Sequence, residues 1–329
     1  KPTLHFLWLR LSRVWPVYLV TLHLAALWII FTLHVGDVPS PDAAKLTAIS
    51  YVRQVFLVQL WFEPFFDGTS WDGPAWSISA EWLAYLLFGA LVLVIFRMAR
   101  VTRARGLLML AFVASLPPTI LLLGSGVFYT PWSWLPRIVA QFLAGALACA
   151  AVRRLRLTDR GQRLAGLGAV ALTVTVVALL YHFDAHPVAG MVDPGGLVDV
   201  LFMPLVVTLA IGVGSLPALL STRLLVYGGQ ISFSVYMVHE MIHTAWSWCV
   251  QQYHLELPKS VQKLVFVALI VAVLLGAMAL YHWVEEPARR WMRRMVDYRD
   301  VRTDDRAGAP PSRLQSIDDA REARSARAV

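Results

Sequence analysis

The chain carries long apolar blocks, each close to the length that crosses a lipid bilayer as one helix. A hydrocarbon core about 30 Å thick takes roughly 20 helical residues to span. About eight blocks approach that length: 14–34, 77–96, 107–123, 135–152, 164–182, 197–214, 231–250 and 262–284. The composition agrees, because 58% of the residues are hydrophobic and only 15% are charged, less charge than soluble domains carry. The sequence therefore predicts an all-α fold, a polytopic bundle of transmembrane helices.

Arginines gather in the short segments between these blocks. Clusters lie before residue 14, at 97–105, at 153–163 and at 289–294. Because cytoplasmic loops are enriched in Lys and Arg, we expect a multi-pass protein of the cell inner (plasma) membrane with both termini cytoplasmic. This distribution also accounts for the net charge of +8 without a nucleic-acid partner, so we expect contact with membrane lipids and none with nucleic acid.

The topology leaves one apolar stretch, 46–62, without a span. The segment 35–76 must begin and end outside the cell, and Arg53, Gln54 and Gln59 interrupt the stretch. We therefore expect an interfacial or re-entrant helix there. We expect residues 1–298 to form the membrane domain and 299–329, where Arg and Asp alternate with Ala, Ser and Pro, to be a disordered cytoplasmic tail.

A carboxylate stands early in the block that follows this stretch. Glu81 follows a loop rich in Trp, Gly and Pro, and helical spacing places Ser77, Glu81 and Tyr85 on one face. A charged residue within a membrane span is costly, so by default it indicates a functional site. On the predicted topology, Glu81 lies near the outer end of its span.

Polar residues also form a stripe on the block at 231–250. Ser232, Tyr236, His239 and His243 recur at steps of three and four, and neutral His is a natural general base. Such residues often only hydrogen-bond to neighbouring helices, and this structural role explains Ser232 as well as a functional role does. That explanation is weakest for Glu81 and His239, which each need a partner or water at membrane depth.

Two further groups are candidate binding residues. Arg10 and Arg13 share a helical face at the cytoplasmic end of the first block, where two guanidinium groups would bind a phosphate. An equally good alternative is that they only set the orientation of the helix in the membrane. Trp71 and Trp76 flank Asp72-Gly73-Pro74 and would either join an interfacial aromatic belt or line a sugar site. Cys149 and Cys249 have no metal-ligand spacing, and we expect no metal.

Four stretches together resemble the acyltransferase-3 family of integral membrane O-acyltransferases. They are the entry Arg10-Leu-Ser-Arg13-Val-Trp-Pro16-Val-Tyr18, the signature Trp76-Ser77-Ile78-Ser79-Ala80-Glu81 with Tyr85, the helix Gly229-Gln-Ile-Ser232-Phe-Ser-Val-Tyr236-Met-Val-His239, and the ending Glu286-Pro287 with Arg290. Each motif is weak alone, but their order along residues 10–290 is fairly specific.

The resemblance implies transfer of an acyl group, usually acetyl from acetyl-CoA, to a hydroxyl of a cell-envelope glycan or related sugar. Acyl-CoA would be a co-substrate, with no bound cofactor. Arg10 and Arg13 would bind the donor's phosphates on the cytoplasmic side. Glu81, His239 and Ser77 become the catalytic candidates, and Trp76, Tyr85, Tyr236 and Trp71 the substrate-binding candidates beside the two arginines.

One departure from the family pattern affects the base. The family opens with a helix that carries an Arg and a His taken to be catalytic, and this chain starts just before the Arg-x-x-Arg entry. Either the chain is an N-terminally truncated product or another residue is the base, and His239 is our substitute. In the expected reaction a His deprotonates the acceptor hydroxyl and Glu81 orients that His or binds the sugar. An acyl-enzyme on Ser77 is an alternative route. A transporter, a polysaccharide-export component and an inactive scaffold are the rival functions.

Overall fold

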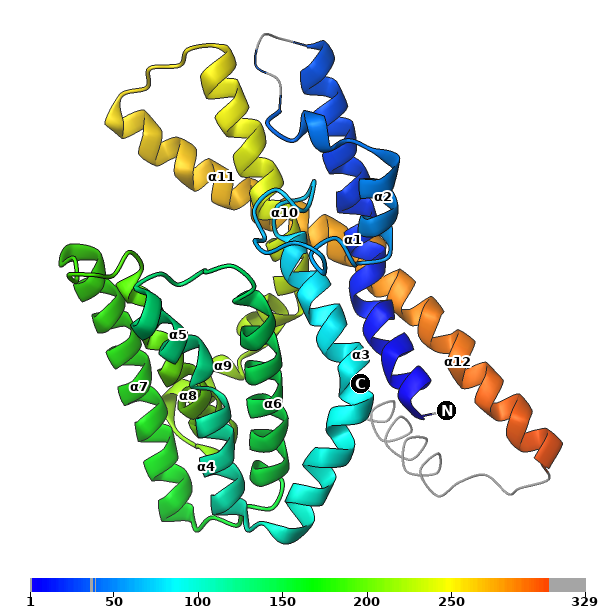
Figure 1. Ribbon diagram of the computed structural model, residues 1–329, viewed down its shortest axis with the longest axis vertical. Helices are drawn as coiled ribbons and strands as arrows, with labels where there is room; N and C mark the ends of the chain where they lie inside the picture. The colour runs from blue at the N-terminus through cyan, green and yellow to red at the C-terminus, as the bar shows by residue number, and fades with distance from the viewer. Residues whose placement is uncertain (1, 36–37, 39, 308–329) are drawn as a thin grey trace.

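The fold is a helical bundle, and a computed structural model describes it for residues 2–307 apart from 36–37 and 39. All regular elements of this part are helical (Figure 1). They are α1 (Pro2–His34), η1 (Ala43–Lys45), α2 (Ala48–Val55), α3 (Ala75–Val101), α4 (Ala104–Ala114), α5 (Pro117–Ser125), α6 (Trp134–Val152), α7 (Asp159–Ala185), η2 (Pro194–Val198), α8 (Asp199–Ile211), α9 (Ser215–Leu220), α10 (Arg223–Gln252), α11 (Lys259–Leu280), η3 (Tyr281–Glu285) and α12 (Glu286–Ala307). The predicted all-α class is confirmed.

Six helical stretches of the described residues are long and apolar enough to cross a membrane, or seven if the bent α3 is one span. The stretches are Thr3–His34, Ala104–Ser125, Trp134–Val152, Asp159–Ala185, Pro194–Ile211 and Lys259–Val296. The missing block of our eight is α10, whose 30 residues are long enough but include His239, Glu240 and His243. Polar side chains thus lower its hydropathy, and the count of eight spans stays a prediction.

The helices form two groups that share α3 (Figure 1). One buried cluster joins α1, α3 and α10 through residues such as Tyr18, Ile78 and Met237. A second joins α3 with α4, α6 and α8. Aromatic rings continue across α3, because Phe88 contacts Phe6 of α1 at 4.7 Å and Phe142 of α6 at 5.5 Å between ring centroids. α3 is therefore the element that holds the two groups together.

The segment between α1 and α3 folds back along α1. The Tyr18 hydroxyl donates to the carbonyl of Gln54, and the Trp15 indole donates to that of Val55, both at 3.0 Å. The Gln54 side chain then accepts from the Trp71 amide at 2.9 Å. Eight residues of α2 rise only about 12 Å, too little to cross a membrane, as expected of an interfacial or re-entrant helix. The segment therefore starts α3 beside the middle of α1.

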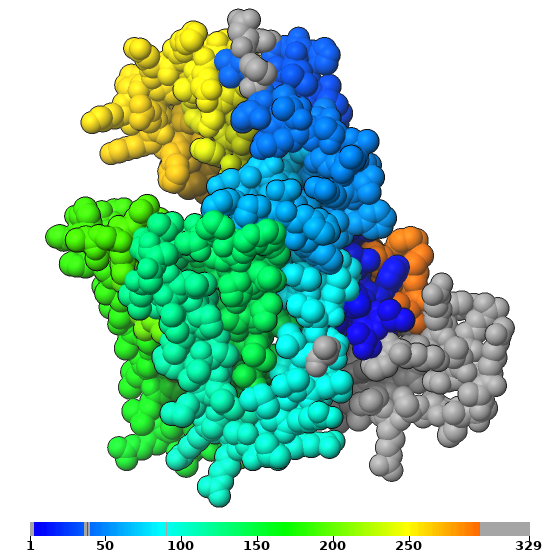
Figure 2. All heavy atoms as spheres, viewed as in Figure 1, coloured from blue at the N-terminus to red at the C-terminus, as the bar shows by residue number. Residues whose placement is uncertain are grey.

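The space-filling view shows the same packing from outside. On this face, atoms of the segment before α3 fill the junction between α1, α10 and the first turns of α3 (Figure 2). Buried polar residues hold this segment internally: the Gln59 amide donates to the carbonyl of Ala75 at 3.1 Å, and Ser79 donates to that of Leu57 at 2.8 Å. The loop is thus packed and hydrogen-bonded where α3 begins.

The last long helical stretch contains a wide turn. Between α11 and α12 the five residues of η3 form a π-helix, in which the amide of Glu286 donates to the carbonyl of Tyr281. Pro287 follows at once, and proline has no amide to continue the regular α-helical ladder. The turn places Glu285 inside the protein, with 1% of its surface exposed.

α12 continues to Ala307, beyond residue 298 where we expected order to end. Residues 308–329 lie outside the described residues, and disorder there stays a prediction.

A glycine contact between α7 and the end of α8 gives a test of this packing. A Cβ atom at Gly166 would collide with the carbonyl oxygen of Val213, whereas one at Gly168 would meet only the Thr208 methyl group, at 3.8 Å. Overpacking costs about 1–3 kcal/mol, more than the roughly 1 kcal/mol that Ala gains over Gly in a helix. We expect Gly166→Ala to lower the midpoint of thermal unfolding in detergent, and Gly168→Ala, the control, to leave it unchanged or raised. Equal midpoints for the two variants would contradict this packing.

Candidate functional site

Most of the predicted site residues meet where α1, α3 and α10 converge. α1 supplies Arg10 and Arg13, α3 supplies Ser77, Glu81 and Tyr85, and α10 supplies Tyr236 and His239. This convergence follows from the start of α3 beside the middle of α1, because a start at the outer end would place Glu81 far from Arg10.

A triad of oxygens joins α3 to α10. The hydroxyls of Ser77 and Tyr236 lie 2.7 Å apart, and both contact the carbonyl oxygen of Pro74, at 3.0 Å from Ser77 and 3.1 Å from Tyr236. Tyr236 keeps 37% of its surface exposed. The two hydroxyl protons are thus used by the Pro74 carbonyl and within the pair, and either hydroxyl becomes a donor for an oxyanion when it turns away from Pro74.

One turn further along α3, Glu81 accepts a short hydrogen bond from the Tyr85 hydroxyl. The guanidinium of Arg10 lies 5.4 Å from the centre of the Tyr85 ring and 5.3 Å from that of Phe6. The expected separation of Glu81 from Arg10, at opposite ends of the membrane, is therefore wrong. Because α3 begins at the middle of α1, the Tyr85 side chain contacts both Glu81 and Arg10.

Arg13 faces a carboxylate that we did not single out. Its charge interacts with Glu285 as well as with the Tyr85 hydroxyl. Glu285 is buried and accepts a hydrogen bond from Ser234 of α10 at 2.8 Å. The neighbouring Glu286, part of the quoted ending motif, instead pairs locally with Arg289 and Arg290. The Glu-Glu-Pro sequence was the available signal, because the proline widens the turn and directs the first carboxylate inward.

His239 lies one turn from Tyr236 on α10. Its Nδ1 is 2.6 Å from the carbonyl oxygen of Tyr236, and the two rings lie 5.7 Å apart. A ring nitrogen that faces a carbonyl carries the proton in the neutral imidazole, which leaves Nε2 as the basic nitrogen. The side chain is exposed, so Nε2 is accessible for a general base. Its catalytic role stays a prediction.

The two tryptophans of the loop point elsewhere. Trp76 stacks on Phe66 at 4.5 Å between centroids and meets the edge of Tyr129 at 6.1 Å. Trp71 is buried, stacks on Tyr51 and donates from its indole to the carbonyl of Lys45 at 3.1 Å. In the described residues, neither indole ring stacks on or hydrogen-bonds to the side chains of Ser77, Glu81 or His239. The structure gives both residues packing roles, and Trp71 also lines a cavity beside α10.

Asp72 and Glu240 form a second pair that we did not predict as site residues. Asp72 is 1% exposed, and its two carboxylate oxygens have no hydrogen-bond partner among the described residues. The hydroxyl of Thr21 on α1 and the carboxylate of Glu240 on α10 both lie near Asp72. Glu240 follows His239 directly, so an acid beside the predicted base was the signal in the sequence.

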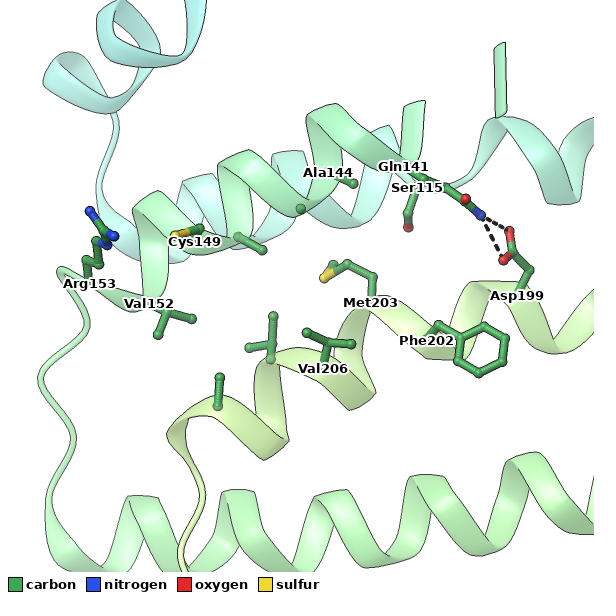
Figure 3. Close-up of a pocket in the computed structure, with 14 residues that line it drawn as sticks. Ser115, Gln141, Ala144, Cys149, Val152, Arg153, Asp199, Phe202, Met203 and Val206 are labelled. Carbon is green, nitrogen blue, oxygen red and sulfur yellow. Dashed lines mark hydrogen bonds between the residues drawn. The ribbon is translucent and has the colours of Figure 1, made fainter. Parts of the chain in front are cut away.

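A further cavity lies elsewhere, between α6 and α8 (Figure 3). It holds about 620 Å³ and is mostly apolar. At one end Gln141 donates to both oxygens of Asp199, at 2.9 and 3.1 Å, and Arg153 lies at the other end. The ring of α6 that packs against Tyr85 belongs to Phe142, and Phe142 does not line this cavity. The cavity is therefore separate from the cluster at α3.

No group of three or more His, Cys, Asp or Glu that could hold a metal ion is found in the part of the chain that the structure describes. The side chains gathered at the convergence of α1, α3 and α10 are two guanidinium groups, a carboxylate, three hydroxyls and an imidazole. This set suits the binding of an anion and proton transfer at an oxygen.

Comparison with known proteins identifies the family. A model of the acyltransferase-3 family, described as an acyltransferase domain, matches residues 1–282. No curated protein and no solved structure matches the chain significantly. The family match covers all seven residues gathered at α1, α3 and α10, and the helices that carry them belong to a multi-pass membrane protein. The chain thus belongs to the acyltransferase-3 family and is a membrane acyltransferase.

Proposed function

We propose that this acyltransferase moves an acyl group, acetyl in the simplest case, from cytosolic acyl-CoA to a hydroxyl of a cell-envelope glycan or related sugar. The observation that supports it is a path of polar side chains that are neighbours in space. The path begins at Arg10, passes Tyr85 and Glu81, and continues to Ser77, Tyr236 and His239. A cytosolic donor and an acceptor from the other side need such a polar path inside the membrane. A transporter would use a similar path, but membership of the acyltransferase family favours group transfer.

Arg10 and Arg13 form the donor end of this proposal. Guanidinium groups bind phosphate oxygens with paired hydrogen bonds, and CoA carries several phosphates. Arg10 is half-buried against aromatic rings, which hold its guanidinium in place, and Arg13 is exposed and therefore accessible to a ligand. The thioester would then extend toward Glu81.

The reaction needs two proton transfers, one from the acceptor hydroxyl to His239 and one from His239 to the CoA thiolate. His239 Nε2 takes the proton of the acceptor hydroxyl as that oxygen attacks the thioester carbonyl. A C–O bond forms, the C–S bond breaks, and the imidazolium returns the proton to the CoA thiolate. The hydroxyl of Ser77 or of Tyr236 would turn away from the Pro74 carbonyl and donate a hydrogen bond to the thioester carbonyl oxygen as its charge develops. Glu81 would orient the acceptor or the imidazolium. Direct transfer requires no acyl-enzyme on Ser77.

Substitution of Glu81 and His239 tests the chemistry. We expect Glu81→Gln and His239→Ala to lower kcat by about 10²-fold or more, because general-base catalysis contributes roughly 10²–10⁴-fold. The measurement is transfer of labelled acetyl from acetyl-CoA to envelope extracts by purified protein. His34→Ala is a matched control, because His34 is an exposed helical His whose Nδ1 also faces a carbonyl one turn back. Unchanged rates in both variants would refute the assignment, and an inactive wild type would favour a scaffold.

Substitution of the arginines tests the donor end. We expect Arg10→Gln and Arg13→Gln to raise the KM for acetyl-CoA by about tenfold, since each removes a hydrogen bond between charged groups. The KM for the acceptor should change little. Arg160→Gln, at an exposed position on α7, is the control. A rise in the acceptor KM alone would place these arginines at the other substrate.

The orientation of the chain is the remaining part of the proposal. We place both termini in the cytoplasm and the protein in the inner (plasma) membrane, because this puts every arginine cluster inside. We expect a fluorescent-protein fusion after Arg156 to be bright and an alkaline phosphatase fusion after Val188 to be active, since these reporters function on opposite sides of the membrane. The opposite pair of signals would invert the topology and exclude Arg10 as a cytosolic donor site.

A further inference from the structure

A second cavity lies between α1 and α10, next to the cluster at α3. It holds about 580 Å³, within the range of roughly 300–1,000 Å³ typical of small-molecule sites. Leu24, Trp28 and Phe31 line it from α1, and Met241 and Ala245 line it from α10. The wall is thus largely apolar and partly aromatic, as ligand-binding cavities usually are.

Two carboxylates lie at this wall. Asp72 is almost completely buried and lines the cavity. The Thr21 hydroxyl lies near it but donates to the Tyr18 carbonyl at 3.2 Å, so neither carboxylate oxygen has a hydrogen-bond partner in the described residues. Glu240 also lines the cavity, and a Cβ atom at Gly73 would lie 3.1 Å from its Cγ, so its side chain packs on the backbone next to Asp72. Buried polar atoms are normally hydrogen-bonded, and each exception needs an explanation.

The chemistry of the cavity defines what would satisfy these oxygens. Carboxylates accept hydrogen bonds, so the missing partners are donors such as hydroxyl groups. Aromatic faces carry negative charge density and attract the weakly positive C–H bonds of a sugar ring. Acceptors of hydrogen bonds beside tryptophan and phenylalanine thus match a molecule with several hydroxyls around an apolar ring face. A hexopyranose has both features.

We propose that this cavity binds a hexopyranose ring of the acceptor, with sugar hydroxyls donating to Asp72 and Glu240 and the ring packing on Trp28. The assignment rests on the proposed function, because it names the acceptor site of the same reaction. Its place supports it: Pro74, two residues after Asp72, carries the carbonyl that holds Ser77 and Tyr236. Tyr236 and Glu240 also lie one turn apart on α10. A sugar bound at the carboxylates therefore lies next to the groups that would act on its hydroxyl.

Direct binding tests the proposal without any acyl donor. Purified protein in lipid nanodiscs is titrated with methyl β-D-glucopyranoside, methyl β-D-galactopyranoside and methyl α-D-mannopyranoside, and saturation transfer to the ring protons is measured by NMR. We expect at least one glycoside to bind, and Asp72→Asn and Glu240→Gln to weaken its binding about tenfold or more, since a hydrogen bond to a charged group is worth roughly 1.5–3 kcal/mol.

A third cavity variant and a control variant distinguish loss of the binding site from misfolding. Ala245→Phe fills the cavity from α10 without touching the carboxylates, and we expect it to weaken binding equally. Glu256→Gln, at an exposed carboxylate in the loop after α10, should bind as the wild type does. Variants are compared only where thermal unfolding matches that of the wild type. Normal glycoside binding in all three cavity variants would overturn the proposal.

Two other outcomes separate this proposal from the proposed function. Preferential binding of tetramethylammonium over every glycoside would overturn it in favour of a cation site. Glycan acylation by the wild type with unchanged acceptor KM in the cavity variants would refute the sugar site and leave the transferase intact. Glycoside binding that depends on Asp72 and Glu240, without acyl transfer from acetyl-CoA, would keep the binding site and refute the reaction.

Discussion

The structure depends on the hydrogen bonds that hold the segment before α3 against α1. Tyr18 and Trp15 bind the end of α2, and Gln54 binds the backbone at Trp71. These bonds satisfy backbone groups that would be expensive to leave unpaired away from water. They also fix where α3 starts. With α3 beginning at the middle of α1, Glu81 and Tyr85 come next to Arg10, and Ser77 comes next to Tyr236.

Polar side chains in the membrane domain are paired rather than scattered. Glu81 has Tyr85, Ser77 has Tyr236, and Glu285 has Ser234. Each pair joins groups that would be costly to bury singly. Asp72 differs, since it is as buried as Glu285 but has no hydrogen-bond partner among the described residues. In an enzyme that must admit two polar substrates, an unsatisfied group of this kind is where a ligand would gain the most.

The sequence predicted the fold class and most members of the cluster but not their arrangement. Hydropathy depends on local composition, so it located most of the candidate spans, and with the arginine placement it predicted the interfacial or re-entrant segment. The helical spacing of Ser77, Glu81 and Tyr85 was enough to place them on one face. The meeting of Arg10 with Tyr85 depends on how far a loop returns along α1, which no local pattern encodes. For the same reason Asp72 was treated only as a residue between two tryptophans, and Glu285 was overlooked beside its motif neighbour Glu286.

The tripeptide Asp72-Gly73-Pro74 belongs to two sites at once. Its first residue lines the cavity between α1 and α10, and its last presents a carbonyl to Ser77 and Tyr236. Only Gly73 separates them, and Glu240 packs on it closely. A displacement of the Asp72 backbone therefore reaches the Ser77–Tyr236 hydroxyls within two peptide units and without any helix moving. So short a mechanical link would couple the alignment of the hydroxyl pair to a ligand in the cavity, and in the proposed reaction it would hold back hydrolysis of the donor until an acceptor has arrived.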